Sequence, residues 1–171
     1  MPVTEILATA LLIDAVVGDP PTVYRRVPHP VAALGHFIAW LERECNAPCR
    51  TDAEHIAIGG ICVIVVVAVA FTTGALVHAI FTDWTGGWLL ESVIVSTLFA
   101  TRSLYEHVQA VAVGLESGLA AGRRAVSHIV GRDPQALDEE AIARAAIEST
   151  AENFSDGVVA PVFWYVVGGL P

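Results

Sequence analysis

The sequence contains no lysine, and its nine basic residues, all arginines, stand against eighteen Asp and Glu residues, a formal net charge of −9. Proteins that bind nucleic acid need a basic surface to displace phosphate counterions, so this balance argues against nucleic-acid binding. Charged residues make up only 16% of the 171 residues and hydrophobic residues 54%. Soluble domains usually carry roughly 25% charged residues. The composition therefore favours an integral membrane protein.

Cysteine is also scarce, with only Cys45, Cys49 and Cys62 in the chain. Three residues separate the first two, but no nearby histidine or further cysteine completes a zinc ligand set. Cys62 lies in an apolar run, where a free cysteine serves as a small hydrophobic side chain. The sequence therefore predicts neither a structural disulfide nor a zinc site.

The two ends of the chain differ in character. The first five residues lack the basic segment of a secretory signal, so no signal peptide is predicted. Residues 157–171 are uncharged and apolar. We interpret this C-terminal segment as the start of a further membrane span that these residues do not complete, so the chain is expected to be truncated at its C-terminus.

The apolar residues come in blocks suited to a lipid bilayer. Residues 56–80 contain no formal charge. As a helix they reach roughly 37 Å, enough to cross a hydrocarbon layer of ~30 Å with some tilt. A second block follows at 88–100, and together they predict a transmembrane hairpin over 55–101. Residues 1–18 are predicted to form an N-terminal apolar helix that is short for a span.

All nine arginines flank this hairpin, and none lies in its turn at 82–87. A hairpin returns the chain to its starting side, so every arginine faces one compartment, which the positive-inside rule identifies as the cytoplasm. Residues 19–54 and 102–156 are therefore expected to be cytoplasmic loops. The predicted fold is all-α, a polytopic helical protein of the cell (inner) membrane with a cytoplasmic helical loop.

Local signals predict two helices within the second loop. Residues 105–121 carry apolar side chains at helical spacing and are followed by Gly122. Asp133 before Pro134 is typical of an N-cap followed by the first helical position. The sequence therefore predicts a second helix that starts there and continues through Ile142.

The end of this second helix concentrates oxygen-bearing side chains. At 100° per residue, Glu148, Glu152 and Asp156 lie within about 80° of one another, with Ser149 and Asn153 beside them. Carboxylate oxygens of this kind suit Mg²⁺, which commonly takes one or two carboxylates plus substrate phosphates. The alternative is the solvated face of an amphipathic helix.

Further candidates lie in the first loop and beside the arginines. Asp14 stands in an apolar stretch, where a carboxylate needs a partner; the alternative is a helix-end carboxylate. Asp19 lies in a Gly-Asp-Pro turn. His29, between two prolines, could be a base, a hydrogen-bond donor to phosphate or a turn residue. Arg102 and Arg132 could bind phosphate or be ordinary membrane anchors. The remaining histidines are predicted to be structural: His36, His55, His78, His107 and His128.

Several motifs keep a common order along the chain: Asp14-x3-Gly18-Asp19-Pro20, His29-Pro30-Val31 with Gly35, Gly131-Arg132-Asp133, and the segment 148–164. Together they resemble the adenosylcobinamide-phosphate synthases, membrane enzymes of cobalamin biosynthesis of the CbiB/CobD type. The Gly-Asp-Pro piece alone would be a weak signal.

The resemblance implies an enzyme that joins adenosylcobyric acid to an aminopropanol phosphate, or a related amino alcohol, through an amide bond. It implies ATP and Mg²⁺ as cofactors, a corrinoid and an amino-alcohol phosphate as substrates, and other membrane enzymes of the pathway as potential partners. The family's C-terminal motifs are missing here, so these residues are expected to be catalytically incomplete. The implied roles are catalysis for Glu148, Glu152, Asp156 and His29, substrate or phosphate binding for Ser149, Asn153, Arg102, Arg132, Asp14 and Asp19, and Mg²⁺ ligation for Glu148, Glu152 and Asp156.

Two other classes compete with this interpretation. A transporter or permease subunit for a small anion or corrinoid would place ionisable groups at mid-membrane. The span at 56–80 carries no formal charge, and the carboxylates lie where a loop meets a span, which favours an enzyme. A purely structural membrane subunit would not need the crowded acidic row.

Overall fold

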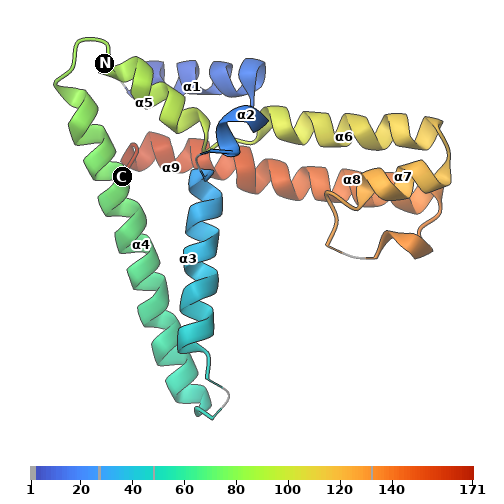
Figure 1. Ribbon diagram of the computed structural model, residues 1–171, viewed down its shortest axis with the longest axis horizontal. Coiled ribbons are helices and arrows are strands. Elements are labelled where there is room, and N and C mark those ends of the chain that lie inside the picture. Colours follow the sequence, from blue (N-terminus) through green and yellow to red (C-terminus); the bar gives the residue numbers. More distant parts are fainter. Residues whose placement is uncertain (1–2, 27, 48, 132) are drawn as a thin grey trace.

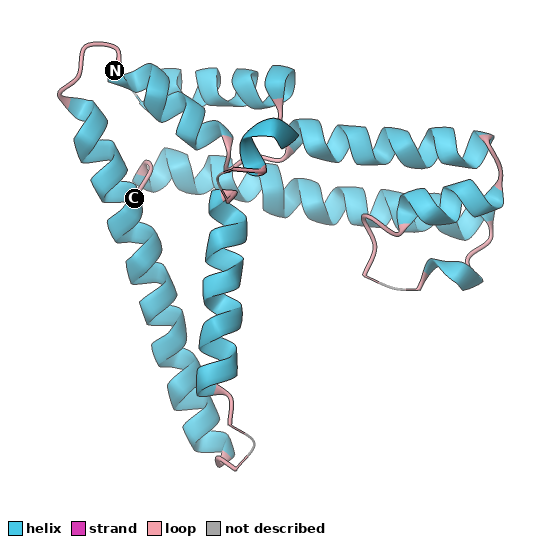
Figure 2. Ribbon diagram, in the orientation of Figure 1, coloured by secondary structure: helices cyan, strands magenta, loops and turns pink. Residues whose placement is uncertain are grey.

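The computed structural model describes residues 3–26, 28–47, 49–131 and 133–171, and these residues form helices joined by short turns, without a strand (Figures 1 and 2). The predicted all-α class is confirmed. The elements are α1 (Val3–Val17), α2 (Pro21–Tyr24), α3 (Pro30–Cys45), α4 (Asp52–Thr82), α5 (Gly87–Ser96), α6 (Thr101–Glu116), α7 (Leu119–Val126), the 3-10 turn η1 (Pro134–Ala136), α8 (Glu139–Phe154), the π-helical turn η2 (Ser155–Val159) and α9 (Ala160–Gly168).

The helices are arranged in two arms around a central region (Figure 1). α3 and α4 meet at their connecting loop and diverge toward the rest of the chain, while α6, α7 and α8 extend together to one side. α8, η2 and α9 form one nearly continuous rod whose second half passes beneath α1. The ends of α1, α3 and α6 therefore meet near the middle of this rod.

The described residues form two hydrophobic clusters, one in the central region and one in the arm of α6, α7 and α8. One joins α1, α5 and α9, and the other joins α6, α7 and α8. Each cluster removes a modest set of apolar side chains from water. This stabilises the fold by about 25 cal/mol per Å² of apolar surface buried. The members are Ile6, Leu7, Ala10, Val95, Phe99 and Tyr165 in the first cluster, and Val111, Val126, Ile142, Ala145 and Ala146 in the second.

α4 is long and almost entirely uncovered. Its start is fixed by a capping box, in which the Thr51 amide donates to Glu54 Oε2 (2.8 Å) and the Glu54 amide donates to Thr51 Oγ1 (3.4 Å). Large apolar side chains such as Ile56 (77% exposed) and Ile64 (69%) point outward. Exposed apolar surface on this scale marks a lipid or protein contact. By length and composition, α4 is the one helix among the described residues that could cross a membrane.

The other half of the predicted hairpin is shorter. α5 has ten residues, which reach about 15 Å, half the thickness of a hydrocarbon layer. The turn before it has the left-handed Gly86 (φ 89°) as the residue preceding the helix. The structure thus contains one helix of spanning length, and the two-span hairpin stays a prediction.

Two predicted helices have different bounds in the structure. The helix predicted over 105–121 is interrupted, because Gly118 (φ 115°) turns the chain between α6 and α7. Gly122 does not terminate a helix but lies inside α7, where an added Cβ would be 2.6 Å from Leu115 Cδ2. Its small size allows α7 to pack closely on α6.

The helix predicted to start at Asp133 was also misplaced. Asp133 Oδ1 does accept from the Gln135 amide (2.9 Å), but it caps only the 3-10 turn η1. Leu137 is extended (φ −82°, ψ 133°), and a second carboxylate, Asp138, caps α8 by accepting from the Ala141 amide (2.8 Å). Helix α8 therefore starts after Asp138 and not after Asp133. An N-cap residue takes a non-helical conformation, so the cap at Asp138 separates the 3-10 turn from α8.

Candidate functional site

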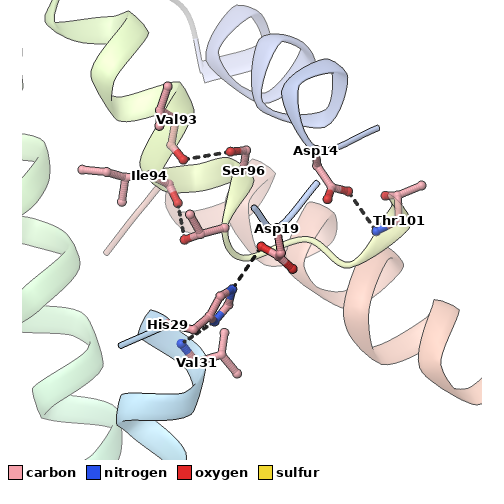
Figure 3. Close-up of polar contacts among 9 residues, drawn as sticks. Asp14, Asp19, His29, Val31, Val93, Ile94, Ser96 and Thr101 are labelled. Atoms are coloured by element: carbon pink, nitrogen blue, oxygen red, sulfur yellow. Dashed lines mark hydrogen bonds and ion pairs between the residues drawn. The ribbon is translucent and has the colours of Figure 1, made fainter. Parts of the chain in front are cut away.

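The N-terminal motif Asp14-x3-Gly18-Asp19-Pro20 is organised around a buried carboxylate at the end of α1. Asp14 is only 2% exposed, and its Oδ2 accepts from the backbone amide of Thr101, the first residue of α6, at 2.8 Å (Figure 3). The first amides of a helix have no partner within the helix, so a carboxylate there is well placed. Asp14 therefore fixes the start of α6 against the end of α1.

Gly18 ends α1 in the left-handed conformation. Its φ is 63°, and its amide donates to the Asp14 carbonyl at 2.8 Å, a helix-ending turn that glycine adopts without strain. The side chain of Arg102 lies directly over it, since a Cβ on Gly18 would be 2.6 Å from Arg102 Cγ. The Arg102 guanidinium is paired with Glu106 on the next turn of α6 and is 43% exposed.

A second group of contacts joins Asp19, Tyr24 and His29. His29 Nδ1 accepts from the Val31 amide at 3.3 Å and so caps α3 (Figure 3). In the neutral ring the proton is then on Nε2, which lies 3.4 Å from Asp19 Oδ1. That approach is close enough for an ion pair but lacks hydrogen-bond geometry, and Nε2 is buried without a hydrogen-bond partner among the described residues.

Tyr24 packs against this pair, with its ring centroid 4.6 Å from that of His29. Burial, and then the charge and hydrogen bond of Asp19, raise the pKa of the Tyr24 phenol above its ordinary value. The three side chains thus form a compact polar group at the start of α3.

The acidic helix changes its geometry where it meets α6. Residues Ser155–Val159 form a π-helical turn, a feature often found at functional sites. The Gly157 carbonyl accepts from the Ala100 amide at 3.1 Å, and a Cβ on Gly157 would be 3.2 Å from Ala100 Cβ. Consecutive amides of Ala100 and Thr101 therefore tie the π-helical turn and Asp14 to one point, which we call the α6 junction.

An open cavity of about 410 Å³ lies beside the α6 junction. The polar side chains that line it come from α6, from the segment after α7 and from the end of the acidic helix. Its lining residues are Ala100, Ser103, Leu104, His107, His128, Ile129, Asn153, Asp156 and Gly157.

The five oxygen-bearing side chains predicted to share one helix face do not all do so in the structure. Glu148, Glu152 and Asp156 are all exposed. Ser149, in contrast, is buried, and its carbonyl accepts from Asn153 Nδ2 at 2.8 Å. The structure therefore separates Ser149 from the exposed carboxylates and directs Asn153 and Asp156 to the cavity. Arg132, predicted to bind phosphate, lies outside the described residues.

Comparison with known proteins gives a consistent family. The family described as CobD/Cbib protein matches residues 7–171. The chain belongs to this family. It is 49% identical over 168 residues to a "Cobalamin biosynthesis protein CobD" of a Sinorhizobium species, covering 97% of this chain and 52% of that protein. Proteins of the same name from Brucella anthropi (47%; 97% and 51% covered) and Rhodobacter capsulatus (43%; 96% and 52%) are also similar.

The family resemblance predicted from the motifs is thereby confirmed, and the chain spans about half the length of the curated relatives it matches. No solved structure matches the chain. Within this CobD/Cbib chain, the α6 junction brings the Asp14–Gly18–Asp19 motif and the acidic segment together in space. They are distant in sequence but are joined through two neighbouring amides.

The predicted Mg²⁺ ligands are exposed carboxylates of α8 and the π-helical turn. Across the described ranges, no group of three or more His, Cys, Asp or Glu side chains is close enough to hold a metal ion. Glu148 and Glu152 lie one helical turn apart on an exposed face. Because Mg²⁺ often takes only one or two carboxylates and completes its shell with phosphate and water, this pair fits the ion.

The sequence predicted structural roles for His107 and His128 and did not indicate that they lie at the candidate site. Both line the cavity, and their ring centroids are 6.5 Å apart. A usable signal was present for one of them, since Ser103 and His107 lie four residues apart on the helix face that begins at the α6 junction. His128 carried no such signal, because its position depends on how the chain folds back after α7.

Proposed function

We propose that this protein acts in cobalamin biosynthesis as a membrane-bound carbon–nitrogen ligase, an adenosylcobinamide-phosphate synthase. It would join adenosylcobyric acid to an aminopropanol phosphate, or a related amino alcohol, and use ATP. The observation that carries the proposal is the α6 junction, which brings Asp14 and the Gly157 turn to adjacent backbone amides. Family membership, with relatives named as cobalamin biosynthesis proteins, supports the pathway to which this reaction is assigned.

The chemistry sets what the site must supply. A carboxylate does not condense with an amine in water unless it is activated, typically as an acyl phosphate. When bound, Mg²⁺ would neutralise charge on the triphosphate and polarise the transferring phosphoryl group. Glu148 and Glu152 would hold the ion, because they are exposed carboxylates on consecutive turns of α8.

The first loop would contribute hydrogen-bond donors. Because His29 Nδ1 accepts from the Val31 amide, the neutral ring would carry its proton on Nε2 and would serve as a hydrogen-bond donor, not as a base. Asp19 would orient that ring. Arg102 would bind phosphate only after exchanging its partner Glu106, while Asp14 supports the site by positioning α6.

Binding contacts would also come from the acidic helix. Asn153 and Asp156 line the cavity and would orient or deprotonate substrate there. Ser149 is buried, so its contribution would pass through the carbonyl that positions Asn153. Arg132 remains a phosphate-binding candidate by its place in the motif.

The proposal includes a location. We place the protein in the cell (inner) membrane as a multi-pass protein, with α4 as a span, residues 157–171 as the start of another, and the loops 19–54 and 102–156 in the cytoplasm. The outward apolar face of α4 supports this placement. Contacts with other membrane enzymes of the pathway would use these apolar faces.

Substitution of Glu152 or Asp156 by Ala in the full-length gene product tests the ligase. Formation of adenosylcobinamide phosphate by isolated membranes should fall by at least tenfold in each variant. Glu140→Ala, which removes an exposed carboxylate of the same helix, is the control. Wild-type rates in both site variants would refute the assignment.

Transport is the second candidate, and one observation favours it. Glu91 in α5 is only 3% exposed and contacts His78 Nδ1 of α4 at 2.9 Å. Ionisable groups inside membrane segments often line transport paths. Uptake of a corrinoid by sealed vesicles, with no product formed by open membranes, would support transport over the ligase.

A further inference from the structure

The cavity beside the α6 junction presents hydrogen-bond acceptors from several directions. Asp156 contributes a carboxylate from the π-helical turn, Asn153 an amide from the end of α8, and His107 an imidazole from α6. His128 also lines the cavity, with its ring centroid 6.5 Å from that of His107. Acceptors from separate elements that converge on one hollow suit a ligand group with several N–H bonds.

The contacts of His107 fix which nitrogen it presents. Its Nδ1 lies 2.7 Å from the Ser103 carbonyl, and a carbonyl can only accept, so the Nδ1 proton is donated there. In the neutral ring, Nε2 then has a free lone pair. His107 is therefore held as an acceptor by its own helix.

Asn153 is oriented in a comparable way. Its Nδ2 donates to the Ser149 carbonyl at 2.8 Å, and this assignment of the amide leaves Oδ1 as an acceptor. Because Ser149 is buried, the bond anchors the amide to the fixed side of the helix. The neutral His107 ring thus uses its one N–H within the protein and Asn153 uses one of its two, and both keep an acceptor for a ligand.

Among the described residues of the lining, no Arg or Lys balances the charge of Asp156. A phosphate would therefore meet a carboxylate and lone pairs without a cation. A primary ammonium group, with three N–H donors and a positive charge, complements the same atoms. Leu104 and Ile129 add apolar surface for a short alkyl chain.

We propose that this cavity binds the primary ammonium end of the amino-alcohol substrate through Asp156, Asn153 and His107. The inference rests on the proposed ligase function and assigns the amine to a different place from the ATP phosphates. The phosphates would lie toward Glu148 and Glu152, one to two helical turns earlier.

The test measures binding of 1-amino-2-propanol to the full-length gene product in detergent, by saturation-transfer difference NMR. EDTA is present and ATP absent, so that no metal or nucleotide contributes. The amine should bind, and 1,2-propanediol, which replaces the ammonium with a hydroxyl, should bind at least tenfold more weakly. Asp156→Asn should weaken amine binding about tenfold, the loss of one charge-assisted hydrogen bond.

Two further variants separate this cavity from general charge effects. His107→Phe keeps an aromatic ring but removes the acceptor, and should weaken amine binding severalfold. Glu140→Gln removes an exposed carboxylate of α8 outside the cavity and should leave binding unchanged. Equal binding of the two probes, unchanged binding in Asp156→Asn, or an equal loss in Glu140→Gln would each overturn the inference.

The results also distinguish this inference from the proposed function. If wild-type protein forms adenosylcobinamide phosphate while Asp156→Asn binds the amine normally, the ammonium site is wrong and the ligase stands. If the amine binds as expected but no product forms under any condition, the ligase is wrong. The ammonium site would then belong to another reaction or to transport of an amine.

Discussion

The buried carboxylate of Asp14 accepts a hydrogen bond of 2.8 Å from the amide of Thr101, 87 residues later in the chain. The neighbouring amide of Ala100 donates to Gly157. Two consecutive peptide groups thus connect the N-terminal motif to the acidic segment. Substitutions at the α6 junction are therefore expected to affect the N-terminal motif and the acidic segment together.

Removal of the Asp14 carboxylate should destabilise the protein. Asp14→Ala leaves the Thr101 amide buried without its partner, a loss of about 1–3 kcal/mol in the free energy of unfolding. Asp14→Asn keeps an acceptor oxygen and should lose less. The measurement is thermal unfolding in detergent, with Asp133→Ala, which removes the exposed cap of a 3-10 turn, as the control. Equal effects of the Ala and Asn variants would contradict the hydrogen-bond account.

Gly18 and Gly35 should respond in opposite directions to alanine. Gly18→Ala places a Cβ at φ 63° and at 2.6 Å from Arg102 Cγ, and should destabilise by about 1–2 kcal/mol from the backbone alone. Gly35 lies within α3 with nothing within 4 Å of an added Cβ. Gly35→Ala should be neutral or stabilise by up to about 1 kcal/mol, since alanine favours a helix.

A double variant isolates the contact between Gly18 and Arg102. Arg102→Ala should recover part of the stability lost in Gly18→Ala, because it removes the 2.6 Å contact with Cγ but keeps Cβ at 3.1 Å and the unfavourable φ. Unfolding of the two single variants and the double variant gives the coupling. Strictly additive losses would show that the arginine stem does not lie over the glycine.

The contact between Asp19 and Tyr24 should be visible in a pH titration. Burial and Asp19 both raise the pKa of Tyr24, burial being the larger cause. Asp19→Asn should therefore lower that pKa toward, but not down to, its ordinary value. The observable is phenolate absorbance in a background where Tyr105 and Tyr165 are Phe. No change in Asp19→Asn would show that the two groups are not in contact.

The same shift predicts a direction for stability. A phenol whose pKa is raised in the folded state stabilises that state fully below pH 10.0, its ordinary value. This contribution is lost as the pH rises through the higher pKa of the folded protein. Tyr24→Phe should therefore reduce the fall in stability above pH 10.0, and an unchanged fall would assign it to other groups.

The sequence predicted those features that depend on local pattern. The apolar run of α4 and the cap at Asp133 were predicted, but a cap at Asp138 that was not predicted moved the start of α8. The motifs also indicated the family. Contacts between residues far apart in the sequence could not be predicted in this way. The burial of Asp14 against α6, and of Ser149 in α8, depends on packing that helical periodicity cannot specify.

The cavity shows the same limit more sharply. His107 and His128 looked isolated in sequence because they lie on separate segments, and they come together only when the chain turns at Gly118 and folds back. The π-helical turn at Ser155–Val159 departs from the α-helical bonding that a helix wheel assumes, so the position of Asp156 could not be read from the wheel alone.

The close approach of Gly157 to Ala100 should limit the size of residue 157. Gly157→Ala brings its Cβ within 3.2 Å of Ala100 Cβ, so the neighbouring helix must shift by a few tenths of an ångström. Gly157→Val, with two further methyl groups, should destabilise by about 1–3 kcal/mol, the usual range for an overpacked site, and should also reduce ligase activity. Both properties should be measured on the full-length gene product.

A compensating variant tests the cause of that loss. Ala100→Gly removes the opposing Cβ and should restore most of the stability of Gly157→Ala, while Gly131→Ala, at a site with open space around it, should have no comparable effect. Recovery of activity together with stability would show that the contact positions Asn153 and Asp156 at the cavity. If Gly157→Val keeps wild-type stability and activity, the π-helical turn is not held against α6, and the connection between the two motif blocks through Ala100 and Thr101 fails with it.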